Sequence, residues 1–468
     1  MSLELKQSMV DGGLWAAGGR LVAIGAAFVL NVALARTLSP ADYGVYFVVL
    51  ITMVILATVA TVGMDQVVVR FVAAHKAMGD WAGVRAVVVR CLAVVLATTA
   101  LVCLVFHLLT PWFFTEVVKM PAAIALGGLM LLWLFFSTLQ RQLAETFRGL
   151  NDIRCATLFG GLRNNGILIS LINCAVALVL WATGTMTLAA VFVMTVCSSL
   201  LVVIVAAWTL WHRLRATDRG PRPAAAATSW STATALHEGW PLLLVGMIGV
   251  LRGPSNGWLA AVFDSAEHVA LYAVAQRFVL LASTPLTIVN ALLPPVVADL
   301  YARGATRRLE NVVQAVGGLA SLPCVVILAL IVLAGRPVLG LLFGDHYQDA
   351  YPLLVVLCVG QVANIVTGSW QIVLPMTGHR QQMLRVSTLA TVIQLGCSIV
   401  GGYAAGVIGV ALGASVGTIV GNALGVLTVH RHLSIWTLIS VRRTVLMEAV
   451  ALLAKRMSAL RPARARGG

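Results

Sequence analysis

The chain has 468 residues, of which 60% are hydrophobic and only 10% are Asp, Glu, Lys or Arg. Because soluble domains carry about 25% charged residues, this composition excludes a soluble enzyme, a DNA-binding domain and a disordered scaffold. The formal net charge of +15 is therefore expected to arise from basic loops on one side of a membrane.

Twelve apolar segments are long enough to cross a bilayer as helices, which takes about 20 residues each. In chain order they cover roughly 13–36, 42–64, 86–109, 121–140, 158–181, 186–211, 239–262, 269–297, 311–334, 350–374, 384–404 and 406–429. Their residues are apolar on all sides, which favours helices over the alternating strands of a barrel. The sequence predicts an all-α polytopic membrane protein with twelve transmembrane helices.

Lysine and arginine are unevenly shared between the two sides of the predicted helices. With the N-terminus in the cytoplasm, 26 of the 32 basic residues fall on the cytoplasmic side and three on the opposite side. Such a bias indicates that both termini are cytoplasmic, and it supports an even number of spans.

The longest loop divides the chain into two sets of six segments. We predict an N-terminal six-helix lobe over 1–212, a cytoplasmic linker over 213–238, a C-terminal six-helix lobe over 239–430 and a basic cytoplasmic tail with an amphipathic helix over 431–468. A weak internal repeat supports this division, because a shift of 226 residues places Ser39 on Ser265. Two parallel lobes are a standard plan of secondary transporters, with a substrate cavity between the lobes near the midplane.

Two local patterns predict how helices begin and pack. Ser39, Pro40 and Asp42 have the spacing of a helix cap, and Ser265 with Glu267 offers a looser version. In the last apolar segment a glycine recurs at every fourth position, which predicts close approach of a neighbouring helix. These glycines are Gly409, Gly413, Gly417, Gly421 and Gly425.

Three arginines lie inside apolar segments, where a charge is costly and usually faces a cavity. They are Arg20, Arg252 and Arg277. Arg252 is followed by Gly253 and Pro254, which can loosen a helix. We predict that these arginines bind substrate in a cavity, with snorkelling to headgroups or a structural ion pair as the alternative. Their polar companions, which can instead form helix–helix hydrogen bonds, are Asn31, Asn256, Gln276 and Asn290.

Acidic residues are placed differently from the arginines. No Asp or Glu lies at the middle of a predicted span, which favours an anionic substrate bound by the planar fork of arginine. Asp65, Glu116 and Asp299 lie near span ends and are candidates for ion coupling, with a structural role as the alternative.

Other kinds of site lack support in the sequence. We find no P-loop, no metal-ligand spacing among the histidines, no nucleophile elbow and no nucleic-acid module. The sequence therefore predicts no catalytic residue, no metal, no cofactor and no nucleic-acid partner.

Several short motifs resemble those of a known family. Residues 35–46, ARTLSPADYGVY, resemble the first outer hairpin of bacterial polysaccharide and O-antigen flippases, the polysaccharide transporter branch of the multidrug/oligosaccharidyl-lipid/polysaccharide exporter superfamily. Residues 63–71, 147–151 and 270–277 are similar to the same family. The resemblance implies a MATE-like fold of two six-helix lobes.

The resemblance also implies a function. Such proteins move undecaprenyl-pyrophosphate-linked oligosaccharide across the bacterial cytoplasmic (inner) membrane by alternating access, for O-antigen, capsule or exopolysaccharide synthesis. Membrane lipids, a polysaccharide polymerase and a chain-length regulator would be its partners. The sequence leaves a multidrug exporter and a lipid II flippase open as alternatives of the same fold. A membrane polysaccharide polymerase or glycosyltransferase is the alternative from another class.

Overall fold

The structure is a computed structural model that describes residues 3–160, 166–216, 232–290 and 293–439. These residues are almost all helical, and they contain no strand. Most of the predicted linker and the predicted tail helix lie outside the described residues. The chain divides into two compact units, an N-terminal unit of Asp11–Ala270 and a C-terminal unit of Leu271–Gly468 together with Met1–Val10.

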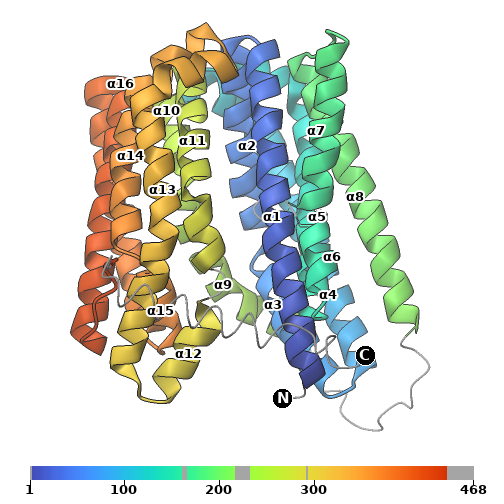
Figure 1. Ribbon diagram of the computed structural model, residues 1–468. Coiled ribbons are helices and arrows are strands. Elements are labelled where there is room, and N and C mark those ends of the chain that lie inside the picture. Colours follow the sequence, from blue (N-terminus) through green and yellow to red (C-terminus); the bar gives the residue numbers. More distant parts are fainter. Residues whose placement is uncertain (1–2, 161–165, 217–231, 291–292, 440–468) are drawn as a thin grey trace, which may run out of the picture. The chain divides into compact units, whose positions relative to one another are not determined.

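The N-terminal unit takes in α1 from Asp11 onward and runs through α10, and its helices are labelled in Figure 1. They are α1 (Leu3–Thr37), α2 (Pro40–Thr61), α3 (Met64–Ala77), α4 (Trp81–Trp112), η1 (Phe113–Val117), η2 (Pro121–Leu126), α5 (Gly127–Gly149), α6 (Ile153–Leu158), α7 (Ile167–Ala182), α8 (Leu188–Ala216), α9 (Thr232–Arg252) and α10 (Ser255–Phe263). α5 contacts α2, α3, α4, α6 and α8, so it forms the centre of this unit.

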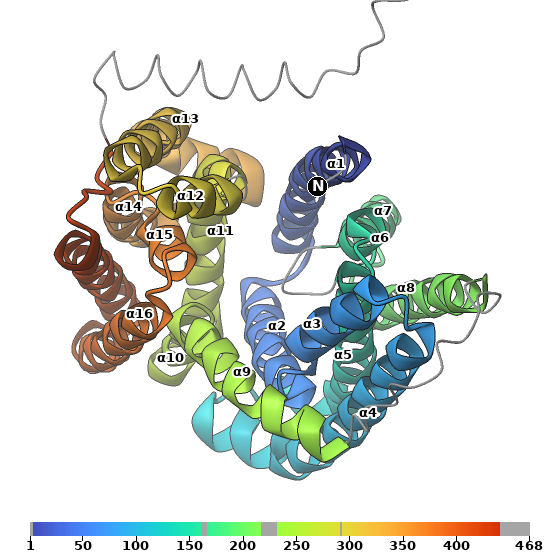
Figure 2. The ribbon, with the colours of Figure 1, turned by 90° about the horizontal axis from the view of Figure 1, so that it is seen from below.

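The C-terminal unit contains the remaining helices, and α11 enters it at Leu271. They are α11 (Ala266–Asn290), α12 (Pro294–Ala302), α13 (Thr306–Phe343), η4 (Asp345–Ala350), α14 (Tyr351–Val366), α15 (Trp370–Met376) and α16 (Arg380–Leu433). α14 and α15 pack against α16, and α12 packs against α13 and α15 (Figure 2).

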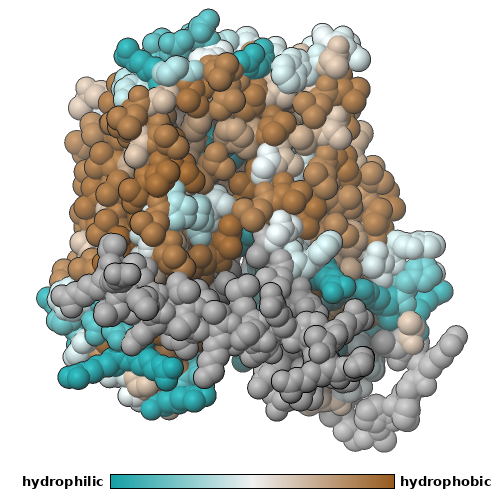
Figure 3. Space-filling model, in the orientation of Figure 1, coloured by the Kyte–Doolittle hydropathy of each residue, from teal (hydrophilic) through white to brown (hydrophobic). Residues whose placement is uncertain are grey.

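The described residues confirm a multi-pass membrane protein. Ten helical segments are long and apolar enough to cross a bilayer, and Ile167–Ala182 is a shorter apolar helix. One of the ten, α16, bends at Ala405 and Gly406, where the backbone leaves the helical conformation, and so supplies two arms. With both arms and the short helix counted, the described residues supply twelve apolar segments in the order predicted. Within each unit, hydrophobic residues cover the middle of the helices and hydrophilic residues gather toward their ends (Figure 3).

Several predicted boundaries were wrong, and the errors share a physical cause. The fourth segment was expected to end at 140, but α5 continues to Gly149 because its polar residues are buried inside the unit. The fifth was expected to begin at 158, where the short helix α6 ends instead, and α7 begins at Ile167. In both places polar groups lie inside the protein. The end of α5 buries polar side chains, and the Gln140 amide donates to the Phe159 and Gly160 carbonyls just after α6. A hydropathy pattern cannot report such burial.

The predicted cap of the second segment is confirmed. Ser39 is the N-cap of α2, its hydroxyl accepts a bond from the backbone N–H of Asp42 at 3.1 Å, and Pro40 occupies the first turn. The Ser265 cap is looser, with 3.4 Å from the His268 backbone N–H to the Ser265 hydroxyl.

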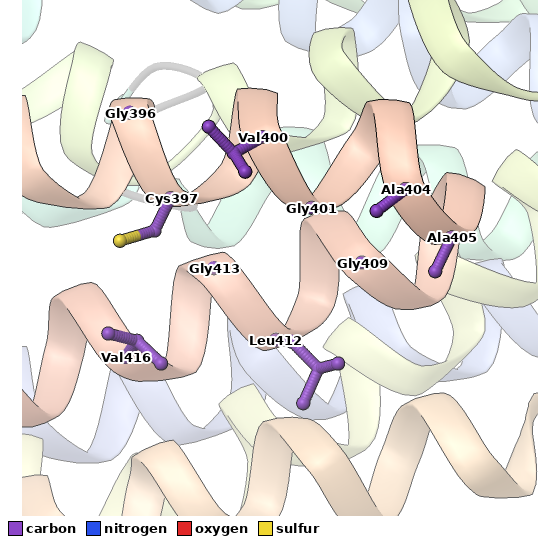
Figure 4. A pocket seen from close by; sticks show the side chains of 10 residues that line it. All are labelled: Gly396, Cys397, Val400, Gly401, Ala404, Ala405, Gly409, Leu412, Gly413 and Val416. Carbon is purple, nitrogen blue, oxygen red and sulfur yellow. The ribbon is translucent and has the colours of Figure 1, made fainter.

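The glycine stripe packs as predicted, between the two arms of α16. A Cβ on Gly409 would lie 1.8 Å from the carbonyl oxygen of Gly401, and one on Gly413 would lie 2.3 Å from the backbone nitrogen of Ser398. Figure 4 shows Gly401 facing Gly409 across the hairpin, beside an apolar groove. Further along the arm, Gly425 leaves room for the buried indole of Trp370.

We expect Gly409→Ala to destabilise the protein by about 1–3 kcal/mol, because its methyl group would enter backbone atoms that cannot rotate away. Gly396→Ala is the matched control, since a Cβ there meets nothing within 4 Å, and a helix gains up to about 1 kcal/mol from such a change. The melting temperature of the purified variants measures the difference. Equal melting temperatures would contradict the packing described here.

The segment after α16 returns across its own unit. Ser434 adopts a left-handed conformation that ends the helix. The backbone N–H of Trp436 then donates to Glu310 of α13 at 3.0 Å, and the Thr437 hydroxyl donates to the Thr367 carbonyl at 3.0 Å. These bonds tie α13, α14 and α16 together at one end.

Candidate functional site

The helix predicted to loosen at Arg252 is broken there. α9 ends at Arg252 and α10 begins at Ser255, so Gly253 and Pro254 form the break. The Ser255 hydroxyl donates to the Leu251 carbonyl, which satisfies one of the acceptors that a helix end leaves free. Arg252 is half-buried at the last position of α9, where a cation is favoured by the helix dipole.

Both halves of the broken helix are held by α2 within the N-terminal unit. The Trp258 indole donates to the Thr52 hydroxyl at 2.9 Å, and a Cβ on Gly257 would lie 2.1 Å from Cδ1 of Ile51. The half-buried ring of Trp258 lies against Phe113 and α2. Asn256, one of the predicted polar companions, is 5% exposed within α10.

The beginning of α9 fits closely against the joint between α2 and α3. Val62 and Gly63 both have positive φ at this joint, 46° and 73°. A Cβ on Gly63 would lie 2.2 Å from the Gly239 carbonyl oxygen, so only glycine fits there. The position of the break is therefore fixed from both of its sides by α2.

The two candidates on α1 have different surroundings. Arg20 is exposed, and the neighbouring Gly19 approaches Ile167 of α7 so closely that a Cβ would lie 2.2 Å from its Cδ1. Asn31 is buried, donates to the Ala27 carbonyl at 2.6 Å and accepts from the Tyr43 hydroxyl at 3.1 Å. Asn31 therefore ties α1 to α2, and its part in substrate binding stays a prediction.

The remaining candidates lie on α11. Gln276 and Arg277 are adjacent and half-buried. Asn290 lies thirteen residues beyond Arg277, about 20 Å along the helix, and accepts a 2.5 Å bond from the Ser369 hydroxyl at the start of α15. The structure thus places Gln276 beside Arg277 in this unit and assigns Asn290 to the contact with α15.

A buried ion pair was missed by the sequence reasoning. Nη2 of Arg141 on α5 lies 2.5 Å from Oδ2 of Asp65 in the first turn of α3, and its Nη1 donates to the Thr58 hydroxyl at 3.2 Å. Both charged side chains are about 10% exposed. The fourth predicted segment ended at 140, one residue before Arg141, and Asp65 was placed near the end of a span. Their 76-residue separation left no local signal of the pair.

The other acidic candidates are exposed. Asp299 accepts from Arg303 one helical turn later, at 2.9 and 3.0 Å. Glu116 lies in η1 and is exposed. Asp65 and Asp299 are thus both engaged with arginines, and their part in ion coupling stays a prediction.

The sequence model of the polysaccharide biosynthesis protein family matches residues 9–300. No curated protein sequence matches the chain. Several solved structures share its fold.

A multidrug resistance MATE family transporter of the MOP superfamily has a TM-score of 0.73 at 17% identity, over 89% of this chain and 98% of that chain. A Pyrococcus furiosus MOP superfamily transporter, described as having a binding pocket of reverse polarity that suggests a different function, has a TM-score of 0.63 at 17% identity, over 90% and 95%. A MATE transporter from Vibrio cholerae has a TM-score of 0.59 at 18% identity, over 92% and 97%.

These findings agree with the architecture described above. The family match covers more than half of the chain, and the structural likeness extends over almost the whole of it. The chain belongs to the polysaccharide biosynthesis protein family and has the fold of the MOP superfamily transporters.

Proposed function

We propose that the protein is a flippase that moves undecaprenyl-pyrophosphate-linked oligosaccharide from the inner to the outer leaflet of the bacterial cytoplasmic membrane by alternating access. Its product would serve O-antigen, capsule or exopolysaccharide synthesis. The observation that carries this proposal is the match to a polysaccharide biosynthesis family in a chain with a transporter fold. In a polysaccharide pathway, the task of a membrane transporter is to carry a saccharide precursor across the bilayer.

The arginines inside the apolar helices give this cargo a chemical rationale. A pyrophosphate presents several anionic oxygens, and the guanidinium fork can bind two of them at once. Arg252 lies at a break in its helix, the kind of discontinuity at which transporters bind charged groups. We assign Arg252, Arg20 and Arg277 to the anionic part of the cargo, and Asn256 and Gln276 to its sugar hydroxyl groups.

The orientation of the chain and its partners belong to the same proposal. The strong bias of lysine and arginine toward one set of loops supports cytoplasmic positions for both termini. A polysaccharide polymerase and a chain-length regulator would act on the cargo after its transfer.

A multidrug exporter is the second candidate, because MATE transporters share the fold. The Pyrococcus furiosus protein supports the view that the fold also serves other functions, since its pocket of reverse polarity is described as suggesting one. An anionic cargo also needs a polarity different from that for cationic drugs, and arginines supply it.

Deletion of the gene should cause the lipid-linked oligosaccharide to accumulate in the cytoplasmic leaflet, with polysaccharide lost from the cell surface. Leaflet-resolved labelling of the oligosaccharide, with complementation by the intact gene, measures this, and mass spectrometry identifies the cargo. Normal levels in the outer leaflet would contradict the proposal. Sensitivity to cationic drugs would then support the exporter, and a growth arrest with lipid II accumulation would support a lipid II flippase.

A further inference from the structure

One face of α8 is turned away from the rest of the N-terminal unit. Its opposite face is buried against α5 and α7 through residues that include Phe192, Val202, Ala206 and Leu210. The last turns of α8 lie at the outer edge of the unit in both views (Figure 1, Figure 2). This face therefore meets whatever surrounds the helix.

The exposed residues of this face change in character along the helix. Ile204 and Val205 are apolar, Trp208 and Trp211 follow one and two turns later, and His212 and Arg215 complete the last turns. Spacings of three and four residues place all six on one side of the helix. Ile204 is 56% exposed and Trp208 62%, and His212 and Arg215 are exposed as well. We call these six residues the α8 face.

The cationic end of the α8 face is held in place by its aromatic rings. The His212 ring lies 4.5 Å from the Trp208 ring and 5.0 Å from the Trp211 ring, measured between centroids. The Arg215 guanidinium carbon lies 3.7 Å from the centre of the Trp211 ring. A guanidinium stacked on a ring keeps its N–H donors in its own plane, where they can bind the oxygens of a phosphate.

Arg215 differs from its neighbour Arg213 in what it contacts. Arg213 pairs with Asp152 and donates to the sulfur of Cys155, both near the start of α6. Within the part of the chain that the structure describes, no carboxylate lies in ion-pair distance of Arg215. Among these described residues, no acidic side chain neutralises the positive charge of the α8 face.

We propose that the α8 face binds one anionic phospholipid, with its phosphate against His212 and Arg215, its glycerol ester region against the two indoles and an acyl chain along Ile204 and Val205. A free phosphate would use only the cationic end. From Arg215 back to Ile204 the face changes from cationic to aromatic to apolar. A phospholipid changes in the same order, from its phosphate through its ester groups to its acyl chains. This site is independent of the proposed transport function.

Native mass spectrometry of the full chain in detergent tests the proposal, with palmitoyl-oleoyl phosphatidylglycerol and palmitoyl-oleoyl phosphatidylcholine supplied in equal amounts. We expect the wild-type protein to retain phosphatidylglycerol in preference to phosphatidylcholine. Arg215→Gln should lower retained phosphatidylglycerol about fivefold, the effect of one cation near an anionic lipid. Trp208→Leu should lower the retention of both lipids. These side chains are exposed, and size-exclusion profiles check that the variants are folded.

Arg307→Gln is the matched control, because Arg307 is an exposed arginine in the first turn of α13 and the substitution removes the same charge from the other unit. It should retain phosphatidylglycerol as the wild-type protein does. Equal retention of the two lipids by the wild-type protein would overturn the proposal, as would full retention by Arg215→Gln. Displacement of phosphatidylglycerol by an equal concentration of inorganic phosphate would identify a site for a free anion and overturn the assignment to a lipid.

Discussion

Replacing Arg252 by alanine should abolish surface polysaccharide while the protein remains in the membrane at its normal level. The substitution removes a half-buried cation from the end of α9 and leaves the glycine and proline of the break in place. Hydrogen bonds to charged groups contribute about 1.5–3 kcal/mol, so an anionic cargo should bind roughly ten- to a hundredfold more weakly. Immunoblots of surface polysaccharide, beside blots of the membrane protein, measure the effect.

Two further variants sharpen this experiment. Arg252→Lys keeps the charge but loses the planar fork, so it should retain part of the activity. Arg385→Ala removes an exposed arginine from the second turn of α16 and should leave surface polysaccharide unchanged. Wild-type levels of polysaccharide in Arg252→Ala would remove Arg252 from the proposed site, whatever the result for the lysine variant.

The second large effect concerns stability. Arg141→Ala should destabilise the protein by about 3–5 kcal/mol, because it leaves the Asp65 carboxylate buried without its partner. The loss should be visible as a lower melting temperature in detergent and a lower yield of folded protein. Arg141→Met combined with Asp65→Leu should recover much of the stability, since an apolar pair of similar size carries no charge to desolvate.

An exposed ion pair supplies the comparison. Arg303→Ala removes the partner of Asp299 on α12, where both side chains are open to solvent, and should cost at most about 1 kcal/mol. If Arg141→Ala melted at the wild-type temperature, the ion pair would contribute no stability. If the double substitution were as unstable as Arg141→Ala, the cost would come from lost packing and not from an unpaired charge.

The number and order of the apolar helices could be predicted from hydropathy, because about 20 consecutive apolar residues are typical of a helix that crosses a membrane. The bend in α16 was predicted at the boundary between 404 and 406, and the backbone leaves the helix at Ala405 and Gly406. Short helices were missed. α3, α6 and α12 have 14 residues or fewer, and their mixed composition is that of loops or of span ends. The mostly apolar α15 was merged with α14 in the segment predicted over 350–374.

The site was only partly predictable from the sequence. The break at Arg252 could be predicted because glycine and proline signal it locally. The engagement of Asn31 with Tyr43 and of Asn290 with Ser369 could not, since each bond depends on how two helices meet. Arg141 was left outside the predicted segment because a hydropathy pattern assigns polar residues to the surface. In the structure, the polar face of α5 is buried among other helices.

The ion pair between Asp65 and Arg141 also sets an order for the synthesis of the chain. Asp65 leaves the ribosome 76 residues before its partner, an interval of roughly 4–15 s at 5–20 residues per second. Until α5 has been made, the Asp65 carboxylate lacks the arginine with which it is buried. The ion pair can therefore form only after α5 has been made, and the joint between α2 and α3 gains its contact with Gly239 of α9 later still.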